Sequence, residues 1–180
     1  DMNVTKKYWE ERDMEVTSAL ASKKIKMLEE QKIRLLELEN TSKIYIRAEG
    51  ECTEPPVYDY EATKEELRRI EESIRKIKHA VNVFNTTTFL ESVGLYIDEA
   101  LVEMNMLNRR KETLKAMSNR LPKERVNQVY TRSNPAVEYR YVNYDIDEVK
   151  KDFEACCQRI FDIQIALDTA NQTMWFEVEV

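Results

Sequence analysis

The apolar residues of this chain recur at helical spacing along four long segments. Residues 67–84 and 149–174 carry unbroken stripes that advance in alternating steps of three and four residues. A third stripe, over residues 97–121, is interrupted at Lys111 and Ser118. Because this spacing keeps apolar side chains on one side of an α-helix, each stripe predicts a helix that buries one face.

The first segment, about residues 5–39, is helical by propensity but carries two apolar stripes instead of one. The pattern therefore predicts a helix without deciding which face it packs. One stripe consists of Met14, Ala21, Leu28 and Leu35, and the other of Ser18, Ile25 and Lys32.

Two short stretches alternate instead, with apolar or aromatic residues at every second position. They are Lys-Ile-Tyr-Ile-Arg at residues 43–47 and Val-Glu-Tyr-Arg-Tyr-Val at residues 137–142. Alternation rich in β-branched and aromatic residues is typical of strands. Because a lone strand leaves its backbone hydrogen bonds unsatisfied, we expect these two to pair with each other. Gly50 and the two prolines at 55–56 indicate a loop after the first strand.

The second and fourth helical segments resemble each other at an offset of 86 residues. The apolar stripe stays in phase throughout, and polar residues match at both ends. The matched ends are Tyr58-Asp59 with Tyr144-Asp145, and Asn85-x-Thr87 with Asn171-x-Thr173. The match favours a duplicated half-unit, with chance phasing of two heptad patterns as the alternative.

Together these patterns predict a mainly α protein. We expect residues 1–180 to form a single helical domain, an antiparallel bundle of long helices with coiled-coil-like packing, plus a small two-stranded antiparallel β-ribbon. The domain would contain two similar helix–strand–helix halves, about 1–90 and 91–180, if the duplication is real. Asp59 and Asp145 are expected to cap helices, and Asn85 and Asn171 to end them in the left-handed conformation.

Composition removes several classes of function. With two glycines, the chain cannot build a phosphate-binding loop, which needs several at fixed spacing. With one histidine, His79, it cannot supply a site made of several imidazoles, and His79 itself is expected on the surface. Three cysteines are an odd number that fits reduced thiols better than a disulfide framework. We therefore predict no cofactor and no metal.

Charge and hydropathy point to a soluble protein with a net charge of -6. No apolar run approaches the roughly 20 residues that cross a bilayer, so no membrane partner is expected. Residues 1–7 are polar and lack the apolar core of a secretory signal, which favours the cytoplasm.

Positive charge concentrates in residues 109–140, which contain nine Lys and Arg against three Glu. This basic segment could contact phosphates or an acidic partner, with tyrosines nearby for stacking. The alternative, which ordinary surface composition favours, is that it neutralises acidic helices of its own or a sister chain. Within it, Lys123, Arg125, Arg132 and Ser133 are the candidate contact residues.

Several short pieces occur in a familiar order: Ala-Glu-Gly-Glu at residues 48–51 before two prolines, Asn85-x-Thr87, Asp-Glu-Ala-Leu at 98–101, Thr-Arg-Ser at 131–133, and Asn171-x-Thr173. From about Ile44 onward the chain thus resembles the septicolysin-like family of small uncharacterised bacterial helical proteins. The resemblance implies a bacterial, cytoplasmic, helical coiled-coil protein and brings no established activity.

Three hypotheses of function follow. The leading one is a non-enzymatic scaffold or protein-interaction module that forms a homodimer or higher oligomer, with Arg132 and Ser133 as a contact point. The second is binding of nucleic acid or another polyanion through the basic segment 109–140. The third is an enzyme that uses the helix ends at Asn85 and Asn171, although the sequence offers no recognisable nucleophile or cofactor loop.

Overall fold

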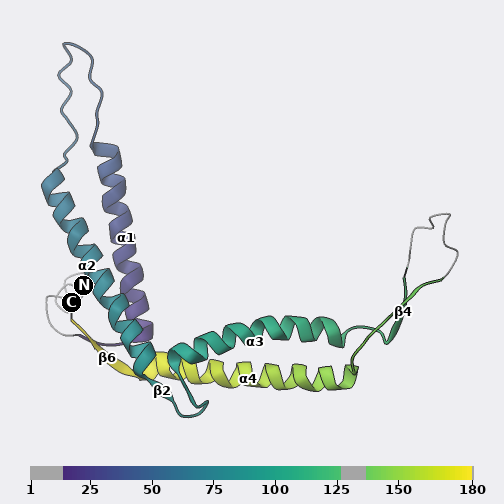
Figure 1. The fold of residues 1–180 in the computed structure, drawn as a ribbon. Coiled ribbons are helices and arrows are strands. Elements are labelled where there is room, and N and C mark those ends of the chain that lie inside the picture. Colours follow the sequence, from purple (N-terminus) through teal and green to yellow (C-terminus); the bar gives the residue numbers. More distant parts are fainter. Residues whose placement is uncertain (1–13, 127–136, 180) are drawn as a thin grey trace, which may run out of the picture. The chain divides into compact units, whose positions relative to one another are not determined.

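The computed structural model describes residues 14–126 and 137–179. These residues form four α-helices and three two-stranded antiparallel sheets, which confirms the mainly helical fold (Figure 1). The helices are α1 (Ser18–Ser42), α2 (Tyr60–Thr87), α3 (Ile97–Ser118) and α4 (Ile146–Thr173). The strands are β1 (Met14–Thr17), β2 (Phe89–Leu90), β3 (Leu95–Tyr96), β4 (Lys123–Arg125), β5 (Tyr139–Tyr141) and β6 (Trp175–Val178).

The chain divides into two compact units. Unit 1 comprises the described residues of Asp1–Thr88 and Thr169–Val180, and unit 2 those of Phe89–Asp168. The first boundary lies close to the expected one at residue 90, but the last residues return to unit 1. They return because β6 pairs with β1 in register from Met14 opposite Val178 to Thr17 opposite Trp175.

Unit 1 is built on the antiparallel pair α1–α2. Lys78 reaches Glu29 at 3.0 Å and Lys32 reaches Glu71 at 2.6 Å, so residue numbers rise along one helix as they fall along the other. The core contains residues of both helices and of the β1–β6 pair: Val16, Ala21, Leu28, Ile70, Ile77 and Val178. Both stripes of α1 contribute to this face, since Ser18 and Ala21 are buried and Ile25 and Leu35 partly so.

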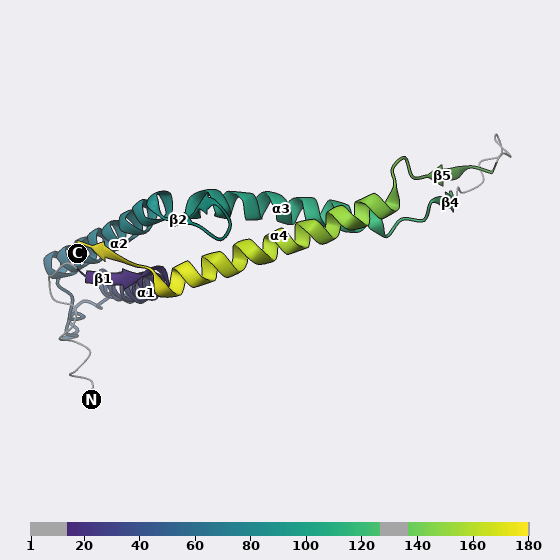
Figure 2. The ribbon, with the colours of Figure 1, turned by 90° about the horizontal axis from the view of Figure 1, so that it is seen from below.

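Unit 2 is built on the antiparallel pair α3–α4 in the same way (Figure 2). Its core consists of Leu114 on α3 with Val149, Cys156 and Ile160 on α4. The short β2–β3 hairpin precedes α3, and its turn contains Gly94 at φ +72°, where an L side chain would be strained.

The helix starts agree with the predicted duplication. Both α2 and α4 are 28 residues long and begin one residue after Asp59 and Asp145 respectively. Asp59 Oδ1 accepts a hydrogen bond from the Ala62 amide at 3.0 Å, and Asp145 Oδ1 accepts from the amides of Asp147 and Glu148. The predicted caps are therefore confirmed.

The predicted strand pairing is wrong. Residues 43–47 form no strand and belong to the irregular segment between α1 and α2, whereas Tyr139–Tyr141 forms β5 and pairs with β4. Residues 126–138 alone separate β4 from β5, so closing this loop costs far less entropy than joining β5 to a segment some 90 residues away.

The sequence did not predict β2, β3 or β4, and it did not predict the two strands β1 and β6 that flank the first and last helices. The first helix begins at Ser18, because Met14–Thr17 is strand β1 and the Thr17 hydroxyl accepts from the Leu20 amide. Residues 5–13 of that predicted helix lie outside the described part of the chain. The last helix ends at Thr173, and the chain continues as β6.

We predict that Ile77→Ala destabilises unit 1 by about 2–5 kcal/mol, because the side chain is fully buried and its loss leaves a cavity. Ile33→Ala makes the same change at a site that is 54% exposed and is expected to cost under about 0.5 kcal/mol. Urea unfolding measures both, and equal effects would contradict the packing described.

The carboxyl of Glu65 on α2 is expected to titrate far below its ordinary pKa. A hydrogen bond from Arg68, with further attraction to Arg68 and Arg69, lowers its pKa from 4.5 to about 2. Its contribution to stability is thus present above pH 4.5 and is lost as the pH falls toward 2. An NMR titration measures this pKa, and Arg68→Gln should return it toward 4.5.

Candidate interaction site

The structure brings together two of the predicted contact residues. Lys123 and Arg125 are both on β4, and both are exposed. Arg132 and Ser133 lie outside the described residues. Asn85 and Asn171 are half-buried in the last turns of α2 and α4, away from β4 in the sequence and in unit 1.

The expectation that Asn85 and Asn171 end their helices is wrong. Both helices continue two residues further, and the cap of α2 is Thr88 in an extended conformation, with its amide donating to the Phe84 carbonyl. In place of a left-handed asparagine, Thr87 and Thr173 each donate a hydroxyl hydrogen bond to the carbonyl four residues earlier. The matching tripeptides therefore have a structural explanation.

The β4–β5 ribbon has two chemically different faces. Residues directly opposite across an antiparallel pair share a face, and so do alternate residues on one strand. One face consequently carries Lys123 and Arg125 with their cross-strand neighbours Tyr141 and Tyr139. The other carries Glu124 opposite Arg140.

On the first face a cation rests over aromatic rings. The Nζ atom of Lys123 lies 4.1 Å from the ring centroid of Tyr139 and 5.4 Å from that of Tyr141. Such cation–π contacts contribute about 0.5–1 kcal/mol at exposed sites. Both tyrosines remain largely exposed, at 44% and 63%, so this face presents apolar ring surface and positive charge together.

On the second face two arginines flank one carboxylate. Glu124 Oε2 lies 3.7 Å from Arg140 and 4.0 Å from Arg120, which leaves a surplus of positive charge. A hollow of about 220 Å³ opens here, lined by Arg120, Leu121, Glu124, Arg140, Tyr141, Val142, Asn143 and Tyr144. At its base the Tyr144 hydroxyl donates to the Met117 carbonyl at 2.9 Å and so attaches the ribbon to the end of α3.

Unit 1 contains the corresponding tyrosine contact. Tyr58, which directly precedes the cap of α2, donates its hydroxyl to Glu39 on α1 at 2.9 Å. Loss of hydration first, and then this hydrogen bond, raises the pKa of Tyr58 above its ordinary value of 10.0. In each unit, a tyrosine thus fixes the second helix to the end of the first.

Within unit 2, one arginine on α4 joins α3 and the β2–β3 turn. Arg159 on α4 donates to Glu103 on α3 at 2.8 Å and to the carbonyl of Val93 in the β2–β3 turn at 3.2 Å. The hydrogen bond to Glu103 raises the pKa of the Arg159 guanidinium above its ordinary value. Arg159 therefore remains charged and serves to join three elements.

A shallow hollow of about 530 Å³ lies between α1 and α2, and His79 is exposed at its edge, as expected. Two ion pairs cross between the helices beside it, Lys32–Glu71 and Lys78–Glu29. All three cysteines are free, with Cys52 exposed and Cys156 buried. Among the described residues no three His, Cys, Asp or Glu side chains gather as a metal site requires.

None of the helices, over the described part of the chain, has the length and apolar character that crossing a membrane requires. No family model matches the sequence. No curated protein matches it either.

The chain is similar in structure to a functionally unknown conserved protein from Corynebacterium diphtheriae, known from its crystal structure. The match has a TM-score of 0.57 at 13% sequence identity and covers 91% of this chain and 99% of that one. At this identity the similarity shows the fold alone. The resemblance to the septicolysin-like family stays a prediction.

Proposed function

We propose that the protein acts by binding protein surfaces, including those of its own copies, through apolar side chains that its helix pairs leave outside. The observation that carries this proposal is the outward side of unit 2. Val102 and Met106 on α3 are 56% and 65% exposed, and Phe161 on α4 is 57% exposed.

These positions are not random surface residues. Val102 and Met106 are four residues apart and share one side of α3, whereas the buried Ala100 and Leu114 lie on the side that packs. Phe161 likewise lies next to the buried Ile160 and points away from the core. Large apolar side chains that repeat along an outward face mark interaction surfaces more often than scattered ones do.

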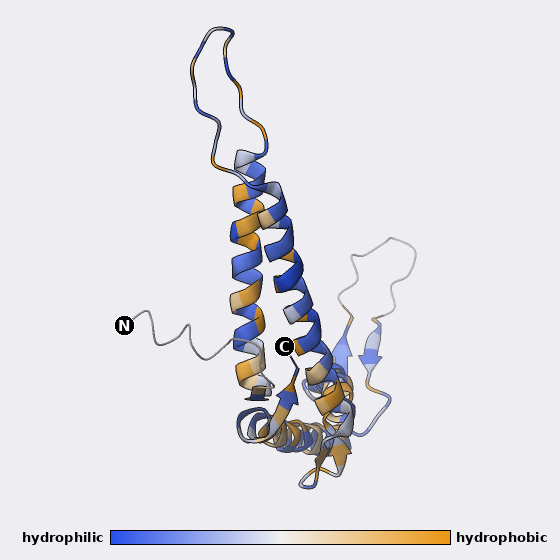
Figure 3. Cartoon of the chain, turned by 90° about the vertical axis from the view of Figure 1, so that its left-hand side faces the viewer, coloured by the Kyte–Doolittle hydropathy of each residue, from blue (hydrophilic) through white to orange (hydrophobic). Residues whose placement is uncertain are grey.

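Unit 1 shows the same feature. On α1, Leu20, Met27 and Leu38 are each more than 40% exposed and are spaced by 7 and 11 residues, which puts them on one side of the helix. Figure 3 shows apolar residues recurring along this helix pair and into the segment that joins the two helices. Both units therefore offer apolar helix faces to a partner.

We expect the protein to self-associate and Phe161→Glu to weaken that association about tenfold or more, because burying one Phe contributes about 1.5–3 kcal/mol. Ala155→Glu adds the same charge at an exposed position of the same helix, six residues away and on another side, and is the matched control. Light scattering across a concentration series measures both. A strict monomer that retains no partner would contradict the proposal.

A second candidate function, binding of a polyanion such as single-stranded nucleic acid, is favoured by the ribbon. Lys123 and Arg125 share a face with two exposed tyrosine rings, and stacking rings beside cations are the chemistry that holds unpaired nucleotides.

For this candidate, Lys123→Glu should abolish retention on heparin or single-stranded DNA at low salt, because it reverses charge at the centre of that face. Lys26→Glu, at an exposed position on α1, should leave retention unchanged. If the unaltered protein is not retained at low salt, this candidate is excluded.

A further inference from the structure

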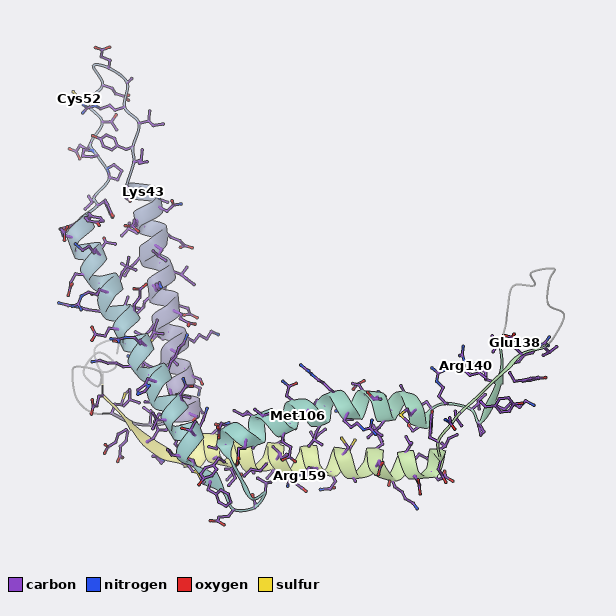
Figure 4. The ribbon with its side chains drawn as sticks, in the orientation of Figure 1. Lys43, Cys52, Met106, Glu138, Arg140 and Arg159 are labelled. Carbon is purple, nitrogen blue, oxygen red and sulfur yellow. The ribbon has the colours of Figure 1, made fainter. Side chains whose placement is uncertain are left out.

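We propose that residues 43–47 of one chain add a third strand to the β4–β5 ribbon of a second copy, alongside β5. This inference rests on the proposed self-association and names its contact. It starts from two observations. Residues 43–47 alternate as a strand does, and the edge strand β5 carries aromatic and charged residues that can pair with them. Figure 4 labels Lys43 at the start of the first segment and Cys52 further along the same loop, and it labels Glu138 and Arg140 at the ribbon.

The donor segment has the residues of a strand but no partner strand. Lys43-Ile44-Tyr45-Ile46-Arg47 alternates apolar and charged or aromatic residues. Lys43 caps α1 with its amide donating to the Glu39 carbonyl, and the residues after it form neither helix nor strand. Ile44 is 74% exposed and Ile46 is 95% exposed. Two exposed β-branched side chains at alternate positions are suited to one face of a pleated strand.

The acceptor is the outer edge of β5. The amide of Val142 bonds the Pro122 carbonyl, and the amide of Val126 bonds the Glu138 carbonyl. In an antiparallel ladder, residue pairs that share backbone hydrogen bonds alternate with pairs that do not. Tyr139 and Tyr141 belong to the pairs without such bonds, so their backbone N–H and C=O groups point away from β4. In the described part of the chain this sheet has two strands, so the Tyr139–Tyr141 edge has no neighbouring strand.

One antiparallel register makes each of the four side-chain pairs of residues 44–47 favourable. It sets Ile44 opposite Tyr141 and Ile46 opposite Tyr139, which are aromatic–β-branched pairs. On the other face it sets Tyr45 opposite Arg140, an aromatic ring beside a guanidinium. It also sets Arg47 opposite Glu138, a pair of opposite charges. A slip of one residue would move both isoleucines to the charged face, so the register is specified by the pattern.

The surrounding charges are complementary as well. The remainder of the donor loop contains Glu49, Glu51, Glu54 and Asp59 and no cation. The two strands of the acceptor carry Lys123, Arg125 and Arg140 against the single carboxylate of Glu124, with Arg120 just before them, so the acceptor has a positive net charge. Opposite net charge on the two partners speeds their encounter and disfavours loop-to-loop or ribbon-to-ribbon contact.

The occupant is a second copy of this chain, because the acidic loop that follows residues 43–47 and the basic β4–β5 ribbon have opposite net charge and are both present on every copy. Residues 43–47 are in unit 1 and β5 is in unit 2, where the described residues show β5 paired with β4. Every chain carries both the donor and the acceptor, so each copy can give one strand and receive another. Strand addition to an exposed edge is a common mode of protein recognition.

The first test compares two substitutions in the same loop. Ile46→Asp puts a charge beside Tyr139 in the proposed contact and should weaken self-association about tenfold or more. Val57→Asp is the matched control, because Val57 is 97% exposed and lies outside the donor strand. Neither change disturbs packing within the chain, so both variants should fold, and sedimentation equilibrium measures the dissociation constants.

The second test fixes the partner and the register with a disulfide. One chain carries Tyr45→Cys and a differently tagged chain carries Arg140→Cys, both with the exposed Cys52 replaced by Ser. Directly opposite residues of a non-bonded pair have the close Cα atoms that a disulfide needs. Mild oxidation should therefore link the two tags. Replacing Tyr45→Cys with Arg47→Cys moves the thiol two residues along and should prevent the link.

The remaining outcomes distinguish the proposed strand contact from the proposed self-association. Self-association that is equally strong in Ile46→Asp and Val57→Asp, with no link between the tags, overturns this contact and leaves the proposed function standing. A disulfide formed within a single chain that carries both cysteines shows that the occupant is the chain itself and also overturns it. A monomer at all concentrations overturns both proposals.

Discussion

A pair of packed helices buries only the sides that face each other. In both units of this chain, that restriction sets how much apolar surface can be buried. In each unit the buried residues form one strip between the two helices, extended in unit 1 by the β1–β6 pair. A third layer that would cover the outer sides does not occur within either unit as described. The fold therefore has little core for its length, and it compensates at the helix ends with specific polar contacts.

Those end contacts repeat between the two units. A tyrosine followed by a capping aspartate begins the second helix of each unit, and each tyrosine bonds the end of the first helix, at Glu39 or at Met117. The 86-residue offset seen in the sequence becomes two helices of identical length. The units differ mainly in what joins their helices, an irregular acidic loop in one and a basic ribbon in the other.

The helices were predictable from the sequence, because the spacing of apolar residues within a segment is enough to indicate a helix and its buried side. The stripes of α2 and α4 contain the residues that are buried, from Ile70 to Phe84 and from Val149 to Ala170. The strands were harder, since alternation indicates that a segment suits a sheet but not which segment it pairs with. Residues 43–47 have the alternation but form no strand in the described structure, whereas β1 and β6 are four-residue strands whose partnership spans nearly the whole sequence.

The candidate site was predictable only in part, for the same reason. Lys123 and Arg125 were recognised by charge, but their place beside Tyr139 and Tyr141 depends on a pairing that composition cannot reveal. The exposed Val102, Met106 and Phe161 could have been found, because they lie outside the apolar stripes of otherwise regular helices. By contrast, Asn85 and Asn171 were given a role that the threonine hydroxyls next to them perform.

The pairing of β1 with β6 sets an order of events during synthesis. Met14–Thr17 is made early, yet its partner Trp175–Val178 leaves the ribosome only after all of unit 2. Unit 2 is continuous in sequence and can fold while the chain is still growing, whereas unit 1 must wait with Val16 and the start of α1 uncovered. The half that is synthesised first is thus the half that is completed last.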